Sequence, residues 1–103
     1  MKKLIRDGKV AVLISPGYGA GWFTWNNHAP QMLWDPTIVQ MLEEGCRPQV
    51  LQQYVEDVYP YVNALGAESL RVVWIPEGTR FRVTEYDGHE SIVLHDEENW
   101  HVA

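Results

Sequence analysis

The chain begins with a pattern of apolar and polar positions that is typical of a β-hairpin. Apolar residues dominate positions 4–6 and 10–14, and Asp7-Gly8 between them is a turn dipeptide that tolerates positive φ. In the second segment the even-numbered and odd-numbered residues point to opposite strand faces, and both sets are apolar. We therefore expect a central strand that is covered on both sides.

Two helical patterns follow in the middle of the chain. Asp35 and Pro36 suit an N-cap and a first-turn position, and Gly45 suits the C-terminal end of the same helix. Residues 47–60 form the second pattern, in which apolar residues recur with helical spacing until Pro60 ends it. The two segments are expected to form a helical hairpin that packs its apolar stripes on a sheet.

Three further strands are expected at residues 70–75, 80–86 and 90–95, with glycine-containing turns between them. The predicted fold class is α+β, with a five-stranded, mostly antiparallel sheet and the helices packed on one face. The sheet would consist of a β-hairpin, a two-helix insertion and a three-strand meander. Residues 1–103 are expected to form a single domain, because the chain is too short for two cores.

The composition is typical of a folded globular domain, with 46% hydrophobic and 21% charged residues. A net charge of −6 argues against general affinity for duplex nucleic acid, which requires a basic face. Cys46 is the only cysteine, so no intrachain disulfide forms and no zinc-type spacing exists. The N-terminus is charged too early for a signal peptide, and no apolar run is long enough to span a membrane. We therefore expect a cytoplasmic protein that requires no cofactor.

The richest candidate site is the segment of residues 15–28, here called the glycine loop. Glycines allow close approach to the backbone, and Trp and Tyr offer flat surfaces with a polar group. The loop lacks the spacing of a dinucleotide fingerprint and of a Walker motif, but successive glycine N–H groups can still bind an anion. The alternatives are a tight structural loop and tryptophans that fill the core. The candidate ligand-binding residues of the loop are Tyr18, Gly19, Gly21, Trp22, Trp25, Asn26 and His28.

A second candidate block lies on the strand at residues 80–86. Arg80, Arg82 and Tyr86 fall on one strand face, where two guanidinium groups and a phenol suit the recognition of phosphate. The alternative is a solvated face whose arginines pair with nearby glutamates.

No catalytic or metal-binding residues are expected. Asp87-Gly88 and the acids around His89 are explained as turn chemistry, and strand neighbours point to opposite faces. Ser15 lacks the sequence context of a hydrolase nucleophile. Trp34 and Trp74 are expected to lie in the core.

Two sequence blocks resemble a family of small proteins encoded by tailed bacteriophages. They are SPGYGAGW-x-TWN at residues 15–26 and PEGTRFRV-x-EYDG-x-E at residues 76–90. The resemblance implies a phage origin and expression in the cytoplasm of an infected bacterium. Small acidic phage proteins without catalytic motifs are similar to counter-defence factors, among them homo-oligomeric sponges that sequester nucleotide signals. The likeness to the sponges is one of size and pocket chemistry.

The leading hypothesis is a non-enzymatic, homo-oligomeric counter-defence protein that binds and sequesters a nucleotide-derived immune signal, of the cyclic oligonucleotide or cyclic ADP-ribose type. Trp22 and Trp25 would stack on the base. The phosphate or ribose oxygens would be engaged by Gly19, Gly21, Arg80 and Arg82. A second hypothesis is an inhibitor that binds a host defence or metabolic enzyme through its surface. A third is a small nucleotide hydrolase that uses His28 or His89 with nearby acids.

Overall fold

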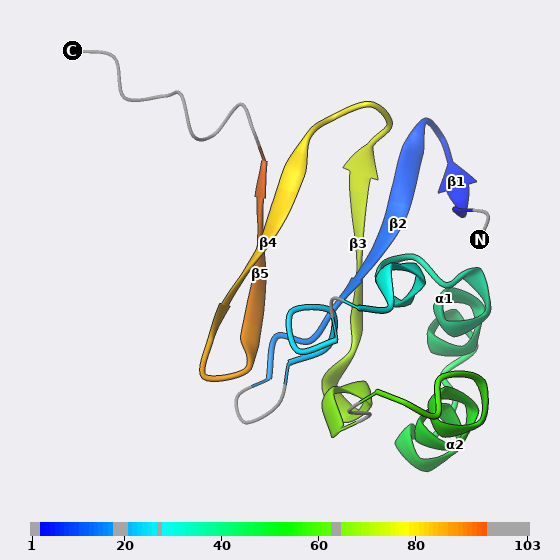
Figure 1. Cartoon of the computed structure of the whole chain (residues 1–103). Helices are drawn as coiled ribbons and strands as arrows, with labels where there is room; N and C mark the ends of the chain where they lie inside the picture. Colours follow the sequence, from blue (N-terminus) through cyan, green and yellow to red (C-terminus); the bar gives the residue numbers. More distant parts are fainter. Residues whose placement is uncertain (1–2, 18–20, 27, 63–64, 95–103) are drawn as a thin grey trace.

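The computed structural model describes residues 3–17, 21–26, 28–62 and 65–94. The elements are β1 (Ile5–Arg6), β2 (Lys9–Ile14), the 3₁₀ helix η1 (Pro30–Leu33), α1 (Pro36–Glu43), α2 (Pro48–Val58), the 3₁₀ helix η2 (Leu65–Ser69), β3 (Arg71–Pro76), β4 (Phe81–Tyr86) and β5 (His89–Leu94). The fold is α+β, as predicted (Figure 1). Within these residues no helix is both long and apolar enough to span a bilayer. His95, at the expected end of the last strand, lies outside the described residues.

The strands form two antiparallel sheets, so the prediction of one five-stranded sheet was wrong. The first, here called the central sheet, has the order β1-β2-β3, and the second is the hairpin of β4 and β5. β3 pairs with β2 from Lys9↔Pro76 to Ile14↔Arg71, whereas β4 pairs with β5 and not with β3. The predicted three-strand meander is therefore broken between its first and second strands, at the turn that includes Gly78.

The physical reason for two sheets lies in β2. Val12 and Ile14 on one face of β2 are as apolar and as buried as Ala11 and Leu13 on the other. Helices α1 and α2 cover only the face of Ala11 and Leu13, and Leu33 of η1 covers part of the face of Val12 and Ile14, so the rest of that face requires a further cover. The hairpin supplies that cover and does not extend the sheet.

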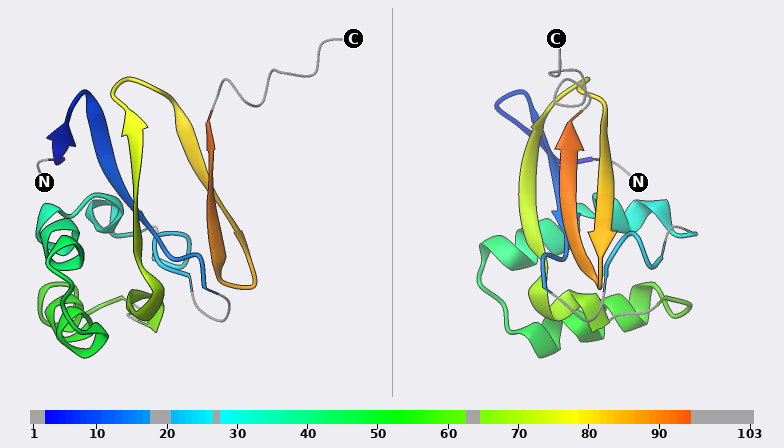
Figure 2. Two further views of the ribbon diagram at one scale, coloured as in Figure 1. Left: turned by 180° about the vertical axis from the view of Figure 1, so that it is seen from behind. Right: turned by 90° about the vertical axis from the view of Figure 1, so that its left-hand side faces the viewer.

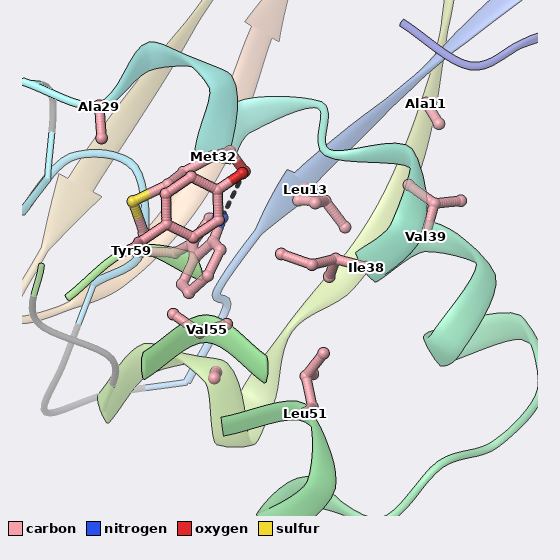
Figure 3. Packing of buried hydrophobic residues seen from close by; sticks show 11 residues of the cluster. Ala11, Leu13, Ala29, Met32, Ile38, Val39, Leu51, Val55 and Tyr59 are labelled. Atoms are coloured by element: carbon pink, nitrogen blue, oxygen red, sulfur yellow. Dashed lines mark hydrogen bonds between the residues drawn. The ribbon is translucent and has the colours of Figure 1, made fainter. Parts of the chain in front are cut away.

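The result is a three-layer arrangement with the central sheet in the middle. Helices α1 and α2 pack on one side, and the hairpin packs on the other (Figures 1 and 2). Figure 3 shows the helix-side cluster, in which Leu13 of β2 meets Ile38, Val55 and their neighbours. The expectation that residues 10–14 form a central strand covered on both sides is confirmed.

The predicted helix boundaries are close to the observed ones. Asp35 is the N-cap of α1, and its Oδ1 accepts hydrogen bonds from the backbone N–H groups of Thr37 and Ile38 at 2.9 and 3.4 Å.

Trp74 is half-buried against the helix-side cluster. Trp34 packs on the hairpin side, where its ring lies edge-on to that of Phe81 with 6.2 Å between the ring centroids. Both tryptophans are partly buried at the border of the core, so the prediction that they lie in the core is confirmed only in part.

Asp35 also ties the two helices together. Its Oδ2 accepts hydrogen bonds from the hydroxyls of Tyr54 at 3.1 Å and of Tyr59 at 2.6 Å. Asp35 is fully buried and Tyr59 nearly so. One carboxylate therefore caps α1 and anchors the C-terminal half of α2.

This cluster predicts a loss of stability in alkali. Burial raises the pKa of Tyr59, and the hydrogen bond to Asp35 raises it further. The folded state then holds the proton more tightly than the unfolded state, in which tyrosine ionises near about pH 10. The protonated Tyr59 hydroxyl therefore contributes fully to stability below that pH, and this contribution declines as the pH rises above it. We expect the free energy of unfolding to fall more steeply between about pH 9 and 11.5 in the wild type than in Tyr59→Phe, as measured by urea denaturation.

The control for this experiment is Tyr61→Phe, which removes a hydroxyl from a side chain that is 88% exposed. Its alkaline profile should match that of the wild type. A Tyr59→Phe profile that also matches the wild type would contradict the assignment.

Candidate functional site

The centre of the glycine loop is occupied by a carboxylate from the far end of the chain. Glu90, at the start of β5, is 1% exposed, and its Oε1 accepts a hydrogen bond from the backbone N–H of Ser15 at 2.8 Å. Its Oε2 accepts bonds from the backbone N–H groups of Trp22 at 3.0 Å and Thr24 at 2.8 Å, and from the Thr24 hydroxyl at 2.7 Å. The loop is thus an anion-binding turn whose anion belongs to the protein itself.

Three further hydrogen bonds fasten the same loop. The backbone N–H of Glu90 donates to the carbonyl oxygen of Ser15 at 2.8 Å, and the Nδ1 of His89 bonds the carbonyl oxygen of Pro16. The hydroxyls of Ser15 and Ser69 are 2.7 Å apart, which links the loop to η2. The loop is therefore held by both the hairpin and the segment before β3.

Close packing explains two of the glycines near this loop. A Cβ atom on Gly66 would lie 2.3 Å from the backbone carbonyl oxygen of Gly21, which is too close for any side chain. A Cβ atom on Gly21 would lie 2.6 Å from the ring of Trp25. These glycines allow two chain segments and an indole to meet, which is the structural alternative considered for the loop.

The predicted site residues of the loop lie in different environments. Trp22 is wholly buried in the helix-side cluster, and its Nε1–H donates to the carbonyl oxygen of Met32 at 2.7 Å. Asn26 is also buried, and its Nδ2 donates to the carbonyl oxygen of Trp22 at 2.8 Å. Trp25 is 42% exposed and His28 is exposed. Tyr18 and Gly19 lie outside the described residues.

The second predicted block lies on the hairpin. Arg82 and Tyr86 share the face of β4 that points away from the central sheet, because Phe81 and Val83 between and beside them pack inward. Both are exposed, Tyr86 to 77%. Arg80 is exposed and directly precedes β4. We call the outward surface of the hairpin the hairpin face; its strand residues are Arg82, Thr84, Tyr86, His89, Ser91 and Val93.

The glycine loop and the hairpin contact each other through backbone groups and through the side chain of Glu90. The contact does not involve the side chains that were expected to share a ligand. The ring of Trp22 lies on the helix side of the central sheet. The side chain of Arg82 lies on the outward surface of the hairpin, which covers the other side. A single cavity lined by both is not formed within the described part of one chain.

Two hollows in the described surface lie elsewhere. The larger, of about 430 Å³, lies between β1 and α1, and the smaller, of about 250 Å³, lies beside Arg6 and Trp74. Neither is lined by a predicted site residue.

Glu90 is the residue that sequence reasoning missed. A signal for it was present, because period-two alternation places Glu90 on the same strand face as Ile92 and Leu94, which pack inward. An acid in an inward-facing row must find donors, and in this fold the donors are the amides of the glycine loop.

Residues 3–17, 21–26, 28–62 and 65–94 contain no group of three or more His, Cys, Asp or Glu side chains that could hold a metal ion. No known family, curated protein or solved structure matches the chain.

Proposed function

We propose that this chain is a non-enzymatic binding protein that recognises a protein partner through the hairpin face. The observation that carries the proposal is the exposure of Tyr86 and Arg82 on one face of β4. Tyrosine and arginine are the residue types that most often dominate the energy of protein interfaces.

A protein partner is favoured over a small ligand by the state of the glycine loop. The amides that could bind a phosphate are engaged by Glu90, and the ring of Trp22 that could stack on a base is inside the core. Small-molecule sites are usually concave, whereas Arg82 and Tyr86 are exposed on the surface of the hairpin. An exposed strand face with an aromatic ring suits a macromolecule better.

In the setting that the resemblance to phage proteins implies, the partner is a host enzyme of defence or metabolism. Binding of the hairpin face would block that enzyme by covering its surface. This activity requires no catalytic group in the chain.

Capture of a nucleotide-derived signal by a homo-oligomer is the second candidate. It is supported by the row of Arg82, Thr84 and Tyr86 along β4, which offers a guanidinium, a hydroxyl and a phenol to one ligand. A neighbouring copy would have to supply the opposite wall of such a site.

The two candidates are separated by affinity capture from host cells with the tagged full chain. We expect Tyr86→Ala to reduce binding of a stoichiometric partner by roughly 30-fold, since hot-spot aromatic residues contribute about 2 kcal/mol or more. Tyr61→Ala is the matched control, because Tyr61 is at least as exposed as Tyr86 and lies beyond α2. It should leave capture unchanged.

A partner that binds wild type and Tyr86→Ala equally would contradict the proposal. Thermal stabilisation of the wild type by cyclic nucleotides or cyclic ADP-ribose isomers, lost in Arg82→Gln, would establish the second candidate in its place.

A further inference from the structure

The outer edge of β4 is an unpaired strand edge. The second sheet contains only β4 and β5, so within the described residues no strand pairs with β4 on its other side. The right-hand view of Figure 2 shows β4 on the side of the hairpin that lies away from β3. Such edges carry backbone donors and acceptors that can pair with another chain.

The register identifies the backbone groups that face this edge. The N–H of Glu90 points away from β4, since it donates to the carbonyl oxygen of Ser15. Residues opposite one another in an antiparallel pair alternate between bonded and non-bonded positions, and Glu85 lies opposite Glu90. The N–H and C=O groups of Glu85, Val83 and Phe81 therefore point outward from the edge, whereas those of Arg82 and Thr84 point toward β5.

The outward face beside this edge differs in charge from the whole chain, although exposed Glu85 lies on the inward row of the same strand. The chain carries a net charge of −6, yet the strand residues of the hairpin face include no Asp or Glu. Arg82 lies in the middle of this face, and Arg80 is exposed just before β4. A segment that binds here with acidic side chains on the outward side meets positive charge.

The inward side of the edge is apolar at Phe81 and Val83, and exposed Glu85 continues the same row toward the turn. Phe81 and Val83 are half-buried against the hairpin-side core, and Trp34 meets Phe81 edge-on at 6.2 Å. A strand added to β4 would place every second side chain beside this apolar row and the others beside Arg82.

We infer that the edge of β4 binds an extended segment of a protein partner by strand addition, and that this segment alternates apolar and acidic side chains. The inference rests on the proposed function for the existence of a partner and adds the mode and chemistry of recognition. Main-chain hydrogen bonds to Phe81, Val83 and Glu85 provide affinity, and the acidic side chains provide specificity.

The test uses a blocked heptapeptide of alternating valine and glutamate as the probe. Added to the isotope-labelled full chain, it should slow hydrogen exchange at the amides of Val83 and Glu85, while those of Arg82 and Thr84, already paired with β5, stay unchanged. The same peptide with lysine in place of glutamate should bind at least about tenfold more weakly, and Arg82→Gln should abolish that preference. Arg47→Gln, an exposed arginine at the start of α2, is the control and should preserve it.

Two N-methylated peptides test the backbone bonds. Methylation of the valines removes the donors that face β4 in antiparallel addition, and methylation of the glutamates removes those that face solvent. An affinity difference of at least about tenfold between the two supports strand addition, because side-chain contacts alone would be affected equally.

Equal affinities, or no slowing at Val83 and Glu85 at millimolar peptide, would overturn the inference. A protein partner whose capture requires Tyr86, but whose complex does not slow hydrogen exchange at Val83 and Glu85, would overturn strand addition. That result would leave the proposed function intact.

Discussion

Glu90→Gln should lower the free energy of unfolding by about 3 kcal/mol, because it leaves buried backbone donors of the glycine loop without an acceptor. Both carboxylate oxygens of Glu90 accept hydrogen bonds, from the backbone N–H of Ser15 on one side and from Trp22 and Thr24 on the other. A glutamine has one acceptor oxygen, so its amide nitrogen would face backbone N–H groups that need an acceptor. The midpoint of thermal unfolding should fall on the order of 15 °C for a domain of this size.

The matched control is Glu85→Gln. Glu85 lies directly opposite Glu90 in the hairpin but is exposed, and its Oε2 accepts one bond, from the backbone N–H of Gly88 at 2.6 Å. Because glutamine can keep that single bond, the loss should be about 0.5 kcal/mol. Urea denaturation of both variants makes the comparison, and equal losses would show that the loop does not depend on the buried carboxylate.

Asp35→Ala should destabilise the chain by a similar amount, about 3 kcal/mol. The substitution removes the N-cap of α1, a loss of about 1 kcal/mol. It also leaves the buried hydroxyl of Tyr59 without its 2.6 Å acceptor and that of Tyr54 without its 3.1 Å acceptor, at a further cost of about 1–3 kcal/mol.

A double-mutant cycle separates these contributions. Tyr59→Phe removes the hydroxyl along with its need for a partner, so it should cost only about 1 kcal/mol in the wild type. In the Asp35→Ala background the same change should cost less, because no acceptor remains to be lost. Additive effects in the cycle would mean that the bond between the two side chains contributes little.

The secondary structure was predictable because its signals are local. Asp35 and Pro36 indicate a helix start through their own backbone preferences, and Asp7 and Gly8 indicate a turn through positive φ, which both residues adopt. Burial on both faces of residues 10–14 could also be predicted from the sequence. The number of sheets could not, because apolar and polar residues alternate along β4 in the same way whether Phe81 and Val83 belong to an added strand of the sheet or pack on top of the sheet.

The candidate site was less predictable for a related reason. A tryptophan in a glycine-rich loop has the same sequence whether its ring faces a ligand or the core, and Trp22 faces the core. The anion that the loop amides suggested was present in the chain itself, 68 residues after Trp22, and only tertiary structure brings Glu90 to them. By contrast, the outward position of Arg82 and Tyr86 followed from alternation alone.

The bond between Ser15 and Glu90 joins residues 75 positions apart, and β2 cannot complete its pairing until β3 exists. Contacts between such distant residues slow folding, because a long loop must close before they stabilise the chain. On the ribosome, the glycine loop must therefore wait for the hairpin to emerge before it gains its buried acceptor. If translation stops before residue 90, the backbone N–H groups of Ser15, Trp22 and Thr24 lack their carboxylate acceptor, and the face of β2 that the hairpin covers stays exposed. Chaperones or proteases would recognise such a chain.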